Sequence, residues 1–231
     1  AADVQGGYSV VRNHLFFGRA WDRFAFRLEG GSVNGSTGVL RSGQDVRQNG
    51  YGFALELEFP NPVSKWEFST KAGIASGDDP ATNDYEGFNF SRNYDVALLM
   101  FNHRQGSPAL KIHSTEAIRD SSLGLTTSLD DEAIGNAVYL APRLKYRWSE
   151  RVDINNTFIF AQTVVRTLAN VGMDVNLGWE WDLDLDWRMR DNFSWMARLG
   201  YMVPGSAWRG GTNNYDNSPN TGLEIKAALT F

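Results

Sequence analysis

Apolar and polar residues alternate without interruption along residues 172–187, GMDVNLGWEWDLDLDW. Side chains on a β-strand point to opposite faces in turn, so this stretch presents one apolar face and one acidic face. A helix would mix the two sets of residues. A strand of a transmembrane β-barrel requires this division, because one face meets lipid and the other meets the lumen. The positions predicted to face lipid are Trp179, Trp181, Leu183, Leu185 and Trp187.

The same two-residue period recurs in weaker form along the rest of the chain. Residues 15–30 are interpreted as one long strand, and the Gly- and Ser-rich residues 31–50 as a long loop. Residues 1–14 fit either an N-terminal arm or an extra strand. The other predicted strands are 51–59, 66–74, 94–103, 109–118, 138–148, 152–160, 193–203 and 223–231.

Loop lengths alternate between short and long. The connections PNPVSK, RQGSP, SER and RMRDN are short, whereas most of the others are long and polar. Bacterial outer-membrane barrels share this plan, with short periplasmic turns and long extracellular loops. The sequence therefore predicts an all-β fold, a transmembrane up-and-down antiparallel β-barrel of about 10 strands, with about twelve as the alternative. Residues 1–231 would form this single domain, with the amino terminus in the periplasm.

The composition excludes several other classes of protein. The chain has no cysteine, which removes disulfide frameworks and cysteine-ligated metals. Its longest apolar run, Val96–Phe101, is far shorter than the ~20 residues of a membrane helix. A net charge of −5 without basic clusters excludes nucleic acid as a partner. The opening AADVQGG lacks signal-peptide features, so we expect a mature chain from which a signal has been removed.

Charged residues on the polar faces of the predicted strands are expected to line the lumen. Basic and acidic residues fall on different strands, which suits a transverse field that favours small polar or charged solutes. The alternative is a structural salt-bridge network that fills the lumen, since barrels range from filled at ~8 strands to open at ~16. The predicted lumen or constriction residues are Arg19, Arg23, Arg27, Glu56, Glu58, Lys71, Arg143, Lys145, Arg147, Glu180, Asp182, Asp184, Asp186 and Arg198.

Three segments resemble known outer-membrane proteins. The amphipathic last strand, which ends in Phe231, resembles the terminal signature that the bacterial outer-membrane assembly machinery reads. DVRQNGY at 45–51 and AGIASGDDP at 72–80 resemble parts of alginate-export-type porins, in which a strand runs into a GDD-containing extracellular loop. Those porins are longer and have a basic lumen for an acidic polymer, whereas the face of residues 174–186 is acidic. The resemblance implies the bacterial outer membrane, with membrane lipid, lipopolysaccharide and the assembly machinery as partners.

No catalytic residue, cofactor or metal site is predicted. His113 and Ser114 are adjacent, but neighbours on a strand point to opposite faces and cannot easily act as base and nucleophile. Asp78, Asp79 and Asp84 have the oxygen ligands that Ca²⁺ prefers, and solvated loop acids are the simpler interpretation.

The function that these features favour is an outer-membrane porin for the passive passage of small polar or charged solutes. One alternative is a closed outer-membrane barrel with a structural or surface-recognition role. A second alternative is a soluble β-sandwich that binds or hydrolyses glycans, since tryptophan-rich alternating strands also occur there. The sequence does not predict an oligomeric state.

Overall fold

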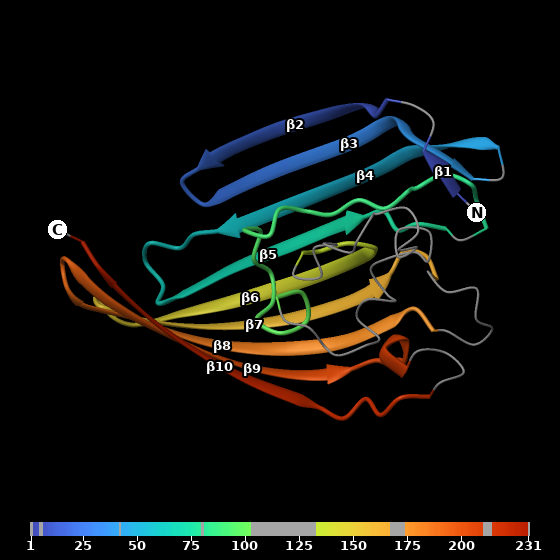
Figure 1. Cartoon of the computed structure of the whole chain (residues 1–231). Helices are drawn as coiled ribbons and strands as arrows, with labels where there is room; N and C mark the ends of the chain where they lie inside the picture. The colour runs from blue at the N-terminus through green and yellow to red at the C-terminus, as the bar shows by residue number, and fades with distance from the viewer. Residues whose placement is uncertain are drawn as a thin grey trace.

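A computed structural model shows the chain as one antiparallel β-sheet (Figure 1). It describes residues 2–4, 7–41, 43–79, 81–102, 133–166, 174–209 and 214–230. The strands are β1 Ala2–Val4, β2 Ser9–Trp21, β3 Phe24–Arg41, β4 Gln44–Phe59, β5 Trp66–Ala75, β6 Ala137–Ser149, β7 Val152–Thr163, β8 Asn176–Arg190, β9 Phe193–Pro204 and β10 Asn220–Leu229. A single 3₁₀ turn, η2 Ser206–Arg209, follows β9. No helix in the described part of the chain is long and apolar enough to cross a membrane.

The long strands follow one another in chain order across the sheet. Each strand from β2 to β10 pairs antiparallel with the next, and the three-residue β1 pairs with the far end of β3. The predicted all-β, up-and-down antiparallel architecture is therefore confirmed. The described residues form nine long strands and one short one, in agreement with the prediction of about 10 strands.

The sheet is open between β2 and β10. These strands lie at its two ends, and no described residue of one pairs with the other. Both run from the long-loop end toward the short-turn end, so a direct pairing between them would be parallel. The N-terminal segment lies at the long-loop end, away from the C-terminal segment (Figure 1). The predicted amino terminus on the short-turn side is therefore wrong.

The cause of that error is a hairpin within residues 15–30, which were predicted as one strand. β2 ends at Trp21, and β3 begins at Phe24, with Trp21 paired to Phe24 across a two-residue turn. Asp22, the one polar residue among the apolar even positions, lies in this turn. Apolar or small residues continue at even positions on both sides of the turn, which is why the sequence resembled a single strand. The turn nevertheless exchanges the faces, because odd positions of β2 pair with even positions of β3.

The hairpin also changes which face two arginines occupy. Arg27 pairs in register with Glu56, on the inner face, whereas Arg19 pairs with Phe26 on the outer face. The guanidinium of Arg19 lies 4.9 Å from the centre of the Trp21 ring, where a cation is attracted to the π-face. Arg23 lies in the turn. The prediction that Arg19 and Arg23 line the lumen is therefore wrong.

Two further segments differ from their predicted structure. Residues 31–50 are not a loop, because β3 continues to Arg41 and β4 starts at Gln44, with Gly43 at φ 80° in the turn between them. The described residues 94–102 form no strand. They cross the inner face of the sheet, and their apolar residues are consecutive rather than alternating. The predicted strand 109–118 lies outside the described residues, as do His103, His113 and Ser114.

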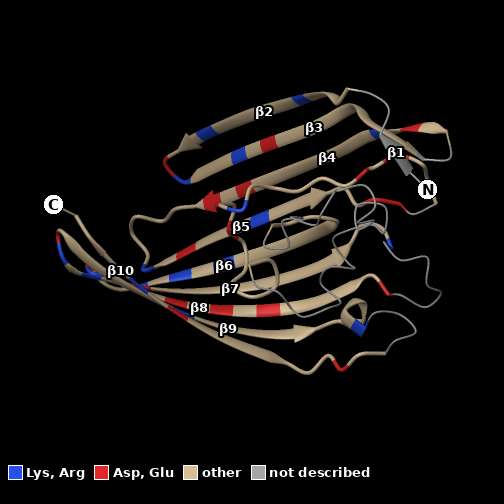
Figure 2. Cartoon of the chain, in the orientation of Figure 1, with Lys and Arg blue, Asp and Glu red and all other residues tan. Residues whose placement is uncertain are grey.

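The two faces of the sheet have opposite chemistry. On the outer face the large apolar side chains of β8, including Trp179, Leu185 and Trp187, are exposed. Aromatic rings form a belt near the short turns, with centroid distances of 5.3 Å for Phe24–Phe59 and 4.5 Å for Trp66–Tyr146. Charged residues recur along the strands (Figure 2), and those of the inner face form ion pairs such as Arg27–Glu56 and Arg198–Asp184.

Trp181→Arg tests the assignment of the outer face. Trp181 pairs with Phe158 and Tyr201 on that face, so a lipid-facing cation there would cost ~2–4 kcal/mol. We expect loss of membrane assembly, measured as loss of the heat-modifiable folded band after insertion into vesicles. Trp181→Phe is the matched control and should assemble. Normal assembly of the arginine variant would contradict the assignment.

Candidate functional site

Residues 94–102, named here the inward segment, cover part of the inner face of the sheet. Every residue of its apolar run, Val96–Phe101, is buried. A strand with one exposed face buries only every second residue, so six consecutive buried residues do not fit such a strand. A segment that packs between other elements can bury all of them. The inward segment therefore forms a core inside the curve of the sheet, together with buried residues such as Ile134 and Tyr139.

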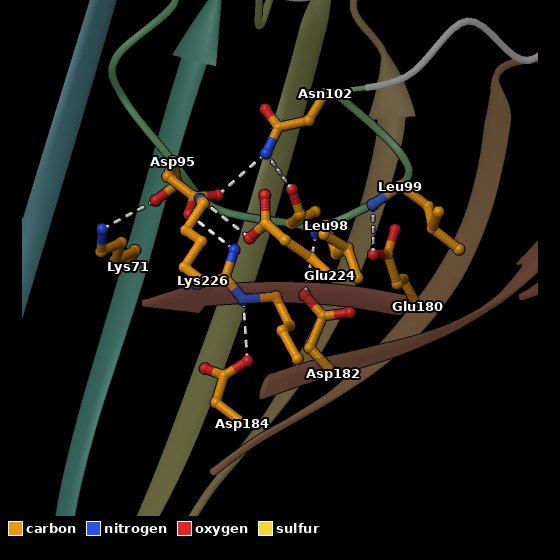
Figure 3. A network of polar contacts seen from close by, with 12 residues as sticks. Lys71, Asp95, Leu98, Leu99, Asn102, Glu180, Asp182, Asp184, Glu224 and Lys226 are labelled. Carbon is orange, nitrogen blue, oxygen red and sulfur yellow. Dashed lines mark hydrogen bonds and ion pairs between the residues drawn. The ribbon is translucent and has the colours of Figure 1, made fainter. Parts of the chain in front are cut away.

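The backbone of the inward segment is held by two carboxylates of β8 (Figure 3). The Leu98 amide donates to Asp182 Oδ2 at 2.9 Å. The Leu99 and Met100 amides donate to the two oxygens of Glu180, each at 2.7 Å. A buried backbone N–H outside a sheet needs such an acceptor, and a charged acceptor makes the stronger bond. Glu180 is fully buried beneath this contact.

Asp95 fixes the beginning of the inward segment to two distant strands. Its carbonyl accepts a hydrogen bond from Lys71 Nζ of β5 at 2.9 Å, and its Oδ2 accepts one from Arg198 Nη1 of β9 at 2.7 Å. Asn102 closes the segment on itself, since its Nδ2 donates to Asp95 Oδ1 at 3.0 Å and to the Ala97 carbonyl at 2.6 Å. The segment is thus anchored at both ends and in the middle.

Inner-face glycines make room for the chain that crosses this face. A Cβ at Gly222 would lie 2.6 Å from Leu99 Cδ2, and a Cβ at Gly200 would lie 3.1 Å from Leu98 Cδ2. Both distances are shorter than the ~3.5–4.0 Å at which carbon atoms pack. Gly50 plays the same part for the preceding loop, because its Cβ would lie 2.7 Å from the Gly87 carbonyl oxygen. The sheet therefore provides a shaped seat for the inward segment.

Ion pairs join neighbouring strands across the inner face. Arg27 of β3 and Lys71 of β5 both approach Glu56 of β4, at 3.0 and 3.3 Å. Asp184 of β8 accepts a hydrogen bond from Arg198 of β9 at 2.8 Å. Each of these three cations thus has an acid on an adjacent strand. The sequence predicted that basic and acidic residues on different strands would create a transverse field across a pore. In the structure these residues form ion pairs between neighbouring strands.

A cavity of about 300 Å³ lies beside the inward segment, which lines it through Asp95 and Val96. Eight of its charged lining residues come from the predicted lumen set and from six different strands, and Asp95 adds an acid that the sequence did not point to. Sequence analysis missed Asp95 and the amides of Leu98 to Met100, although the uninterrupted run Val96–Phe101 was a signal against an alternating strand. The predicted residues that line the cavity are Arg27, Glu56, Glu58, Lys71, Arg143, Asp182, Asp184 and Arg198.

Apart from Arg19 and Arg23, the remaining predicted lumen residues lie elsewhere on the inner face. Lys145 and Arg147 line a second, more open pocket of about 730 Å³ beside the short turns. Lys145 lies 3.0 Å from Asp153 there, and Arg147 pairs with Glu67. Asp186 accepts a hydrogen bond from Asn155 Nδ2 at 2.9 Å. The structure therefore divides the predicted lumen set between two levels of the inner face.

The loop acids proposed as calcium ligands hold their own loop together. Asp78 Oδ1 accepts the Glu86 amide at 2.8 Å, and Asp79 Oδ1 accepts the Ala81 amide at 2.9 Å. Burial, with Asp78 nearby, raises the pKa of Tyr85 to about 12. Within the described ranges, no group of three or more His, Cys, Asp or Glu side chains is placed to hold a metal ion.

Comparison with protein families finds no match for the chain, and comparison with curated proteins finds none either. The resemblance of residues 45–51 and 72–80 to alginate-export-type porins therefore stays a prediction. Solved structures do match. One is OmpT, an in-vitro folded outer membrane protein of Vibrio cholerae, at 9% identity and a TM-score of 0.46, over 96% of this chain and 56% of that one. The chain thus spans just over half the length of that protein.

Glu180→Gln tests whether carboxylates hold the inward segment. The amide side chain keeps one acceptor oxygen of two and carries no charge, so the Leu99 and Met100 amides lose a bond and the segment loosens. Because the chain lacks cysteine, Met100→Cys gives a single reporter. We expect a water-soluble maleimide to label this cysteine about tenfold faster in the Glu180→Gln background. That ratio corresponds to a loss of about 1.4 kcal/mol in the free energy that holds the inward segment against the sheet.

The matched control is Asp186→Asn, on the same face of the same strand, because Asp186 accepts a hydrogen bond from Asn155 of β7. It should leave the labelling rate at its starting value. Equal rates in the Glu180→Gln and starting proteins would show that the two amides do not depend on this carboxylate.

Proposed function

We propose that the chain forms a channel in the bacterial outer membrane through which small polar solutes pass without a cofactor. The observation that carries this proposal is the charged cavity left between the inward segment and strands β3 to β9. A buried core segment narrows the space inside the curve of the sheet but leaves a polar opening beside it. A protein whose interior served only as a core would fill that opening with apolar side chains.

The outer face supports a membrane location. Leu223 and Ile225 of β10, like Trp179 and Trp187 of β8, are exposed apolar side chains on that face. The aromatic belt beside the short turns, which includes the exposed Trp66 and Trp148, has the position of an interfacial girdle. Contiguous apolar surface of this extent on a protein in water would drive association.

The alternatives make different demands on the same features. A soluble β-sandwich needs a second sheet over the apolar face, but the described strands all belong to one sheet. A closed outer-membrane barrel with a surface-recognition role remains compatible with the ion pairs of the inner face, and it requires that no solute passes the cavity. Export of an acidic polymer needs a basic lumen, whereas acids outnumber cations around this cavity.

Lipopolysaccharide contact and recognition of Phe231 by the assembly machinery are further parts of the proposal.

Single-channel recording in planar bilayers tests the channel directly, with Ser69→Trp as the informative variant. Ser69 lines the cavity from β5, so an indole there fills much of the opening. We expect discrete conductance steps from the starting protein and a reduction of at least about half in the variant. Phe68→Trp, one position away on the outer face, is the matched control and should conduct normally. Silence of the folded starting protein would support the closed barrel instead.

A further inference from the structure

The acids around the cavity are already engaged by the protein itself. The Asp184 side chain is only 6% exposed and bonded to Arg198, and Glu56 is 20% exposed between Arg27 and Lys71. Asp182 gives one oxygen to the Leu98 amide, and its other oxygen is buried. These carboxylates are therefore poorly placed to meet a solute, although the cavity has a formal excess of acids.

The two more exposed acids are each held by an arginine. Glu58 pairs with Arg27, and Asp95 accepts a hydrogen bond from Arg198 at 2.7 Å. Pairing of this kind weakens the negative potential that a cation would follow, because both carboxylates have an arginine at contact distance.

Arg143 is the exception among the cations of the cavity. Its side chain is 40% exposed, and among the described residues it forms an ion pair with Asp184 Oδ2 at 3.8 Å from Nη2, which is beyond hydrogen-bond distance. Asp184 is already bonded to Arg198 at 2.8 Å. Arg143 Nε is buried and has no hydrogen-bond partner among the residues that the structure describes. The exposed part of the side chain thus keeps guanidinium donors that the described protein groups leave unused.

We propose that Arg143 is the solute-binding cation of the cavity and that the solutes are small monocarboxylates. A planar guanidinium edge matches the two oxygens of a carboxylate. Ser69 and Thr157 lie in register on either side of Arg143, on β5 and β7, and both line the cavity with hydroxyl groups. The inference deepens the proposed channel function and rests on it.

The size and charge of the cavity narrow the solute class. A volume of about 300 Å³ is at the lower end of the range for ligand sites, which suits a small solute. Five acids against four cations disfavour a multiply charged anion such as phosphate, because the added repulsion grows with solute charge. The guanidinium of Arg143, with its unused donors, therefore suits a solute that carries one negative charge.

The test is a comparison of conductance in potassium acetate between the starting protein and Arg143→Gln. The starting protein should prefer acetate over potassium in reversal-potential measurements, and its conductance should saturate as acetate rises. In Arg143→Gln we expect the acetate-to-potassium permeability ratio to fall about threefold or more and saturation to disappear. Arg147→Gln is the matched control, because Arg147 lies on the same strand face but is held by Glu67 outside the cavity. It should keep the saturation.

A second variant keeps the proposal testable if Arg143→Gln does not fold. Arg143→Lys retains the charge but loses the planar edge, so it should keep the acetate preference and saturate only at severalfold higher acetate. Unchanged saturation in this variant would overturn the binding role of Arg143. Equal permeability ratios in Arg143→Gln and Arg147→Gln would also overturn it, while leaving the channel itself in place. Absence of conductance from every folded variant would instead remove the channel function.

Discussion

A backbone that leaves a sheet must still satisfy its amides, and this requirement organises the interior of the protein. Glu180 and Asp182 accept three consecutive amides of the inward segment at 2.7 to 2.9 Å. Without these acceptors, burial of residues Val96–Phe101 would leave N–H groups unpaired at a cost of ~1–3 kcal/mol each. The acidic face of β8 is therefore first a support for the core segment, and its effect on solutes is secondary.

The division between the two faces follows from this support. Inner positions are small, as at Gly200 and Gly222 beneath the inward segment, carry charges that pair across strands, or add an apolar side chain to the core, as at Tyr139. Outer positions have no such partner within the described chain, and they carry the aromatic and aliphatic residues. One alternating sequence thus serves two different environments, and the same strand β8 supplies both Trp179 for the outer face and Glu180 for the inner core.

Sequence alone could predict the parts of the fold that depend on alternation. The faces of β4 to β10 and the short turns between β4 and β5, β6 and β7, and β8 and β9 follow directly from it. The hairpin at Asp22 was missed because apolar or small residues continue at even positions on both sides of the turn, and Asp22 alone interrupts them. The inward segment was missed for a different reason, since the acceptor for the Leu98 amide lies 84 positions away at Asp182. No local pattern records such a contact, and the cavity that depends on it was equally out of reach.

The anchoring of Asp95 has a mechanical consequence. Its carbonyl accepts a hydrogen bond from Lys71 of β5, and its carboxylate accepts one from Arg198 of β9. One residue therefore connects two strands across the curve of the sheet. Flattening of the sheet would stretch both bonds, and a tighter curl would compress the segment between them. We therefore expect the width of the opening and the curvature of the sheet to change together.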